Sequence, residues 1–170
     1  MVRLNQFRLA HFPRLISWLD TPKKLEQFAS SRFVFPLTTA QLTTSINDGN
    51  RIAFYLTETE TGICFGHAEI FLTRNSVRLE HLLIGDPLMR GTGLGLEMVQ
   101  RLVEYSFDTL DQVLVESTIS EENINAIRCF EMAGFTLNDA KLSEFEKEGK
   151  IWKMLNMTLD KKTWELQNQL

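Results

Sequence analysis

The sequence predicts a mixed α/β domain in which helices flank a mostly antiparallel central sheet of about six to seven strands. Two patterns indicate this class. Residues 51–84 contain three successive segments rich in β-branched and aromatic residues, separated by short turns, as in consecutive antiparallel strands. From residue 93 onward, segments with a helical period alternate with short apolar runs, as in a crossover between parallel strands.

Length and composition agree with one domain. The chain has 170 residues, of which 44% are hydrophobic and 24% charged, as in ordinary soluble domains. A chain of this length buries roughly two-thirds of the surface exposed by its unfolded form, so its core needs no metal or disulfide. Because no repeat or linker-like stretch is visible, we expect residues 1–170 to form a single domain.

The first fifty residues predict a short strand over Val2–Phe7 and two helices. Thr21 is a capping residue before Pro22, and proline is favoured at a first helical position, so a helix should run through Phe28. Residues 38–41 open another helix, which ends near Asp48 and Gly49.

Three strands should follow in antiparallel order. Arg51–Glu58 and Ile63–Leu72 are joined by Thr59–Gly62, which is typical of a hairpin. A turn at Arg74–Ser76 then leads into Val77–Ile84.

The second half predicts two helices and three more strands. Met98, Val99, Leu102 and Val103 share one face of a helix over residues 93–107. A second helix is expected over residues 123–133, with Gly134 in a left-handed cap. The expected strands are Val113–Val115, Phe135–Leu137 and Lys150–Leu159, with Glu146–Gly149 as the turn between the last two.

Charge and cysteine content exclude several functions. The net charge of -4 lacks the basic excess that binding to a phosphate backbone requires, so we expect no nucleic-acid partner. Cys64 and Cys129 belong to no cluster of metal ligands, so neither a metal site nor a disulfide framework is expected. No apolar run approaches membrane-spanning length and no signal peptide is evident, which predicts a cytoplasmic protein without a membrane partner.

The segment from Leu82 to Gly95 carries the main functional signal. A strand leads through Asp86-Pro87 into three alternating glycines and a helix. Unpaired N–H groups and a partial positive charge at a helix start favour an anion, and glycines let it approach the backbone. We therefore expect a phosphate or pyrophosphate ligand, although a plain turn with close helix packing at Gly95 would also explain the glycines.

Spacing excludes two common phosphate loops. Gly95 is followed by Leu96-Glu97 rather than by the Lys-Ser/Thr that ends a Walker A loop. A dinucleotide fingerprint needs a further glycine three residues after the second one, and this sequence has none at that spacing.

The remaining pattern, Arg90-x-x-Gly93-x-Gly95 after Asp86-Pro87, resembles the acyl-coenzyme A loop of the GNAT superfamily of N-acetyltransferases. The stretch from Asn123 to Phe135 is similar to the second signature of that family. Within that family, the chain resembles the branch of ribosomal-protein-alanine, polyamine and aminoglycoside 6'-acetyltransferases at three places: Trp18, Asp86-Pro87 and the stretch 145–157.

This resemblance implies the acyl-CoA N-acyltransferase fold and direct acetyl transfer from acetyl-CoA, without a metal, to a primary amine on a peptide or small molecule. It also implies a monomer or homodimer. Backbone groups of one segment would pair with the pantetheine arm: Leu82, Leu83 and Ile84. Amides of the loop would bind the pyrophosphate: Arg90, Gly91, Thr92, Gly93, Leu94 and Gly95. Asn123 would contact the pantetheine, although it is equally suited to cap a helix, and Phe130 would also belong to the acetyl-CoA site.

Removing a proton from the attacking ammonium requires a base. The resembling branch often carries a glutamate ten residues before the loop arginine, which indicates Glu80, and strand alternation places Glu80 on the face of Leu82 and Ile84. A cross-strand pair of Glu80 with Arg51, Arg74 or Arg78 is the structural alternative. His67 and His81 are the other candidate bases.

Phe130 departs from the family pattern, because many members have a tyrosine there that protonates the leaving thiolate. Cys129 points elsewhere on the helix and is a poor substitute. The general acid is therefore unassigned, and a non-catalytic acyl-CoA-binding module is an alternative function. A nucleotide-phosphate enzyme is a third possibility, which rests on the glycines alone.

Substrate recognition should fall to the N-terminal helices and the hairpin at residues 145–151. Several aromatic residues there line an acceptor pocket or belong to the core: Trp18, Phe28, Phe33, Phe35 and Trp152.

Overall fold

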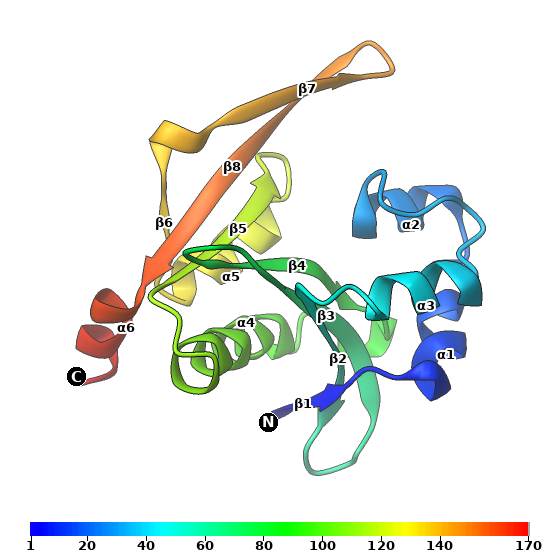
Figure 1. Ribbon diagram of the computed structural model, residues 1–170, viewed down its shortest axis with the longest axis horizontal. Coiled ribbons are helices and arrows are strands. Elements are labelled where there is room, and N and C mark those ends of the chain that lie inside the picture. The colour runs from blue at the N-terminus through cyan, green and yellow to red at the C-terminus, as the bar shows by residue number, and fades with distance from the viewer. Residues whose placement is uncertain (170) are drawn as a thin grey trace. The chain divides into compact units, whose positions relative to one another are not determined.

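The computed structural model describes residues 1–169 and divides into two compact units (Figure 1). The first unit comprises Met1–Phe71 with Glu80–Leu94, and the second comprises Leu72–Leu79 with the chain from Gly95 onward. Strand β4 (Val77–Ile84) contributes residues to both units.

The first unit contains three strands besides β4: β1 (Val2–Gln6), β2 (Arg51–Glu58) and β3 (Cys64–Leu72). Its helices are η1 (Leu9–His11), α1 (Phe12–Trp18), α2 (Pro22–Ala29), α3 (Thr39–Ile46) and η2 (Pro87–Met89). The strand order is β1-β2-β3-β4, with β1 antiparallel to β2 and β2 antiparallel to β3. These are the expected strands, in the expected order.

Capping residues begin two of these helices where the sequence predicts. The Thr21 hydroxyl accepts a hydrogen bond from the Lys24 amide (3.2 Å), with Pro22 at the first helical position of α2. Thr38 accepts from the Gln41 amide in the same way at the start of α3 (3.3 Å). Each cap satisfies an amide that has no partner inside the helix and contributes about 1 kcal/mol.

The helices of the first unit cover a continuous hydrophobic core. Phe12 and Leu15 from α1 and Leu19 just after it are at most 2% exposed, and Leu25 and Phe28 from α2 join them. Trp18, Tyr55 and Leu83 pack against this core as partly buried residues. The core therefore holds β2, β3 and the second half of β4 under the N-terminal helices.

The second unit contains four strands after β4: β5 (Leu114–Ser120), β6 (Thr136–Leu137), β7 (Ser143–Lys147) and β8 (Lys150–Asp160). Its helices are α4 (Leu94–Glu104), η3 (Tyr105–Thr109), α5 (Ile124–Met132), η4 (Asp139–Lys141) and α6 (Lys161–Asn168). Val77 and Arg78 of β4 pair in parallel with Val115 and Glu116 of β5, which confirms the predicted crossover. Strand β8 runs antiparallel to β5, β6 and β7.

Helix α4 buries the face that the sequence predicts, because Met98, Val99, Leu102 and Val103 are at most 5% exposed. It ends earlier than expected, at Glu104, and one turn of π-helix, η3, continues to Thr109. Ser106 Oγ donates to the Leu102 carbonyl (2.7 Å) at this change of pitch.

The sheet has eight strands, one more than the sequence segments predict. The additional strand is β7, whose side chains are all exposed, so it lacks the alternation of apolar residues that marks a half-buried strand. Glu146 and Lys147, expected in the turn, belong to β7. The turn itself is Glu148-Gly149, and φ is positive at both (52° and 74°), as in tight hairpins.

Among residues 1–169, no helix has the length and apolar character needed to cross a bilayer.

Candidate active site

The predicted phosphate loop begins where β4 ends. A side chain at Gly85 would collide with the Trp18 ring, so this glycine permits close packing. The Gly85 amide donates to the Phe65 carbonyl (2.8 Å), and the Asp86 carboxylate accepts from the Leu88 amide (3.0 Å). The loop is therefore attached to β3 before it turns toward α4.

The next two glycines are required by backbone conformation rather than by packing. Gly91 and Gly93 have φ angles of +73° and +90°, and a Cβ added at either would have no heavy atom within 4 Å. Residues with a side chain rarely adopt such angles. The open space over both glycines and the unpaired amides of the first turn of α4 fit an anionic group.

Arg90 and Thr92 stabilise this loop from within. Arg90 Nε donates to the Ile84 carbonyl (3.1 Å), and Thr92 Oγ1 donates to the Met89 carbonyl (2.6 Å). Leu94 is buried at the start of α4, and Gly95, which follows it, belongs to the second unit.

Residues Leu82, Leu83 and Ile84 are half-buried in the second half of β4. Gly66 of β3 lies directly against the Leu83 carbonyl, where a Cβ would clash. Within residues 1–169, the register of β4 with β5 comprises only Val77 and Arg78. The segment Leu82–Ile84 thus lies beyond that pairing.

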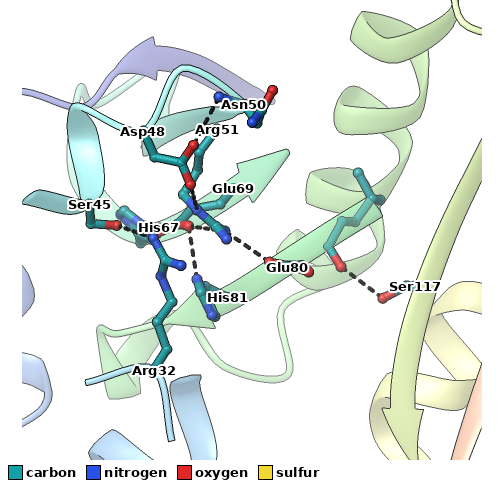
Figure 2. Close-up of polar contacts among 11 residues, drawn as sticks. Arg32, Ser45, Asp48, Asn50, Arg51, His67, Glu69, Glu80, His81 and Ser117 are labelled. Carbon is teal, nitrogen blue, oxygen red and sulfur yellow. Dashed lines mark hydrogen bonds and ion pairs between the residues drawn. The ribbon is translucent and has the colours of Figure 1, made fainter. Parts of the chain in front are cut away.

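The candidate catalytic residue Glu80 is part of a buried polar cluster, drawn in Figure 2. Arg51 of β2 donates from Nη1 to Glu80 Oε2 (2.9 Å) and to Glu69 Oε2 (2.7 Å). The Arg51 and Glu69 side chains are 5% and 4% exposed, and that of Glu80 is 25% exposed. Of the alternatives foreseen for Glu80, the pair with Arg51 is therefore present.

Glu69 is the centre of this cluster. Its Oε1 lies 3.0 Å from His67 Nε2, and its Oε2 lies 2.8 Å from His81 Nδ1. Burial by itself raises the pKa of Glu69, but the hydrogen bonds from His67 and His81 outweigh it and hold the pKa well below its ordinary value. An ionised carboxylate only accepts hydrogen bonds, so both histidines present an N–H to Glu69.

His81 interrupts the regular alternation of β4. Its φ is +51°, in the left-handed region that a non-glycine residue rarely adopts. Successive residues of a regular strand point to opposite faces, yet here Glu80 and His81 both reach the Arg51–Glu69 pair. The alternation used to place Glu80 with Leu82 and Ile84 is therefore broken at His81.

The two histidines have different surroundings. His67 is 1% exposed and meets the Phe7 ring edge-on (4.5 Å between centroids), and its Nδ1 has no hydrogen-bond partner among the described residues. His81 packs beside the rings of Phe28 (5.2 Å) and Phe33 (6.2 Å), with its side chain 10% exposed.

The aromatic residues considered for an acceptor pocket lie in both units and have different surroundings. Phe28 and Phe33 are buried in the core, whereas Phe35 is 40% exposed. Trp18 lines a cavity of about 200 Å³ in the first unit together with Tyr55 and His67. In the second unit, Trp152 stacks on Phe145 (6.3 Å, 10°), with the Lys150 ammonium over its ring (4.1 Å).

The second signature lies in the second unit. Asn123 Oδ1 accepts from the Ala126 amide (3.2 Å), so Asn123 caps α5, as its alternative role requires. Phe130 is 4% exposed and packs edge-on against Phe135 (4.8 Å, 75°). Gly134 ends α5 with φ +98°, the predicted left-handed cap.

Sequence reasoning missed Glu69. A usable signal was present, because His67 and Glu69 stand two residues apart, on one face of a strand whose other residues are largely apolar. In the described part of the chain, no group of three His, Cys, Asp or Glu side chains is arranged to hold a metal ion.

Comparison with known proteins agrees with the motifs. The family described as "Acetyltransferase (GNAT) domain" matches residues 2–136. An N-acetyltransferase 9-like protein of Nematostella vectensis is 26% identical over 155 residues, which cover 84% of this chain and 76% of that protein. An aminoglycoside N(6')-acetyltransferase of Klebsiella pneumoniae is 38% identical over 53 residues, 31% of this chain and 26% of its own length.

Solved structures show the same fold. Spermidine N-acetyltransferase from Vibrio cholerae, in complex with CoA and spermine, has a TM-score of 0.79 at 17% identity, covering 96% of this chain and 98% of its own. Aminoglycoside acetyltransferase AAC(6')-Ib in complex with coenzyme A has a TM-score of 0.77 at 18% identity, covering 99% of both chains. The structures thereby confirm the expected fold class, and the match over residues 2–136 confirms the GNAT family that the motifs resemble.

Proposed function

The chain belongs to the GNAT acetyltransferase family as an acetyl-CoA-dependent N-acetyltransferase, and we propose that it transfers the acetyl group directly to a primary amine. The observation that carries this proposal is the family match over residues 2–136, which includes both the strand β4 and the glycine loop. We take the acceptor class from solved proteins with the same fold, one of which is in complex with CoA and spermine. We propose a peptide N-terminus, a polyamine or an aminoglycoside-like amine.

In this proposal the loop binds the pyrophosphate of acetyl-CoA through backbone amides of residues 90–95. Its support is the left-handed conformation of Gly91 and Gly93, which leaves open space over the backbone at the start of α4. A helix start attracts the anion even in a chain with a net charge of -4. The Arg90 side chain, which donates to the Ile84 carbonyl, matters less than its amide.

The pantetheine arm pairs with Leu82–Ile84 in this proposal. Its support is that this segment lies beyond the described pairing of β4 with β5, since an extended ligand can pair with the backbone of a strand edge. Asn123 and Phe130 belong to the second unit, and their contact with acetyl-CoA stays a prediction.

Catalysis requires a neutral amine, and the base that deprotonates it is one of the three candidates that the sequence names, Glu80, His67 and His81. Phe130 offers no hydroxyl to protonate the leaving thiolate, so the general acid is unassigned. A cytoplasmic location and a monomeric or homodimeric state also stay predictions.

A non-catalytic acyl-CoA-binding module is the second candidate, favoured by Phe130 alone. Free thiol release separates the two functions: the protein is mixed with acetyl-CoA and a panel of peptides, polyamines and aminoglycosides. We expect thiol release that depends on one class of amine. Acetyl-CoA binding by calorimetry without turnover on any amine would instead support the binding module, and absence of binding would refute both.

A further inference from the structure

We infer that the imidazole of His81, oriented by Glu69, accepts the proton of the attacking amine. The inference rests on the proposed N-acetyltransferase function and names the base of the same site. It concerns groups that lie in one unit, on strands β2, β3 and β4.

The first step is the fixed tautomer of His81. Glu69 is 3% exposed, and its Oε2 lies 2.8 Å from His81 Nδ1 while also accepting from Arg51. Because the carboxylate only accepts, the proton of neutral His81 sits on Nδ1 and the lone pair on Nε2. A carboxylate behind an imidazole also stabilises the imidazolium that forms when Nε2 takes a proton.

The second step is the position of His81 in the chain. It directly precedes Leu82–Ile84, the segment proposed to pair with the pantetheine arm. The left-handed backbone at His81 brings its ring to Glu69, and strained backbone of this kind persists mainly where function requires it.

The third step excludes the competing groups. Glu80 Oε2 accepts from the Arg51 guanidinium (2.9 Å), so this carboxylate already neutralises a buried cation. His67 shares Glu69 with His81 but is 1% exposed and enclosed by Phe7 and Phe28. Of the two histidines bound to Glu69, His81 has the more accessible ring.

The proton balance is simple. His81 Nε2 takes one proton from the substrate ammonium and later returns it to water. The neutral amine nitrogen then forms a bond to the acetyl carbonyl carbon while the carbon–sulfur bond breaks. The second proton of that nitrogen passes to the departing sulfur, giving an N-acetyl amide and the free thiol of CoA.

The charged groups near His81 come from three strands and the turn before β2. Glu69 from β3 pairs with both His81 and Arg51 of β2, while Glu80 from β4 and Asp48 before β2 also pair with Arg51. The apolar rings of Phe28, from α2, and Phe33, just after α2, pack beside His81. The nearby Arg32 guanidinium donates a hydrogen bond to Ser45 Oγ. A general base acts only while its lone pair is free, so the rate should fall on the acid side of the pH profile.

The test compares kcat against pH for wild type and His81→Asn, with asparagine chosen because it tolerates left-handed backbone. We expect kcat to fall about 100-fold, the lower range for loss of a general base, and the acidic limb of the profile to disappear. Acetyl-CoA affinity, measured by calorimetry, should stay within about threefold, which separates a lost base from a lost binding site.

Three matched variants complete the test. His67→Asn and Glu80→Gln should keep the acidic limb, whereas Glu69→Gln should move it to lower pH, because a neutral amide stabilises the imidazolium less. If His81→Asn does not fold, the shift in Glu69→Gln decides. An acidic limb that survives in His81→Asn, or that vanishes in Glu80→Gln or His67→Asn, would overturn the inference. Failure of wild type to bind acetyl-CoA would overturn the proposed function itself.

Discussion

The glycine loop and the Glu69 cluster, both in the first unit, use opposite means to prepare a site. The loop of residues 85–94 relies on backbone, with left-handed Gly91 and Gly93 and open space above them. The cluster relies on side chains, with Glu69 bound by Arg51, His67 and His81 and almost fully buried. A backbone site tolerates changes of side chain at non-glycine positions, whereas a buried side-chain site depends on each member.

The largest expected effect is a loss of unfolding free energy when a member of the Glu69 cluster is replaced. Arg51→Met removes the guanidinium and leaves Glu69 and Glu80 without their cation in a buried position, so unfolding free energy should fall by about 3–5 kcal/mol. Urea denaturation measures this loss. Lys24→Met, which breaks the exposed pair with Asp20, is the matched control and should leave the midpoint almost unchanged. Equal losses in the two variants would show that the cluster is not a buried network.

The pH dependence of stability should also come from the cluster. The pKa of Glu69 is lower in the folded protein than in the unfolded chain, so its contribution is present above the unfolded pKa and is lost as pH falls through the folded pKa. Each proton taken up on unfolding changes the slope by about 1.4 kcal/mol per pH unit. Wild type should therefore lose stability below about pH 4.5 more steeply than Glu69→Gln. Parallel denaturation profiles for the two proteins would contradict this assignment.

In the glycine loop, Gly93 is the position where a substitution should most affect acetyl-CoA affinity. Alanine there must adopt φ near +90°, which costs about 1–2 kcal/mol, so acetyl-CoA affinity should fall about tenfold. Gly49, which also has open space around it but a φ outside the left-handed region, is the control, and Gly49→Ala should bind acetyl-CoA normally. Calorimetric titration of both variants distinguishes the loop conformation from a general effect of adding a methyl group.

The smallest effect is expected at Arg90. If its amide rather than its side chain binds the pyrophosphate, Arg90→Met should change acetyl-CoA affinity by less than about threefold. The hydrogen bond from Arg90 Nε to the Ile84 carbonyl is lost, but the positive φ angles at Gly91 and Gly93 do not depend on it. A tenfold loss in the same titration would show that the guanidinium itself binds the anion.

Sequence reasoning succeeded where the signal is local. Thr21 with Pro22 marks the start of α2, the apolar face of α4 follows its period, and Gly134 ends α5, because caps and periods depend on neighbours within a few residues. The loop motif is equally local, and it indicated the family that the match over residues 2–136 shows.

It failed where residues far apart in the chain decide the outcome. Strand β7 carries no apolar alternation, and only its pairing with β8 reveals it. In the sequence, Glu69 is one acidic residue in a largely apolar strand. Its partners Arg51 and His81 lie on β2 and β4, so only the folded structure shows the cluster. The sequence offered three arginines as partners of Glu80, and in the folded chain Arg51 is the one that binds it.

By itself, then, the sequence determined the mixed α/β class, the positions of most strands and the glycine loop, since these follow from short-range propensities and from motifs that the chain carries in one piece. Tertiary structure alone decided which charges meet in the core and which way His81 faces. Its left-handed φ of +51° is uncommon for any residue other than glycine, and the neighbouring sequence, which has the composition of a strand, does not predict it. Burial in the cluster with Glu69 and Arg51 compensates for that strain, and such compensation exists only after the strands have assembled.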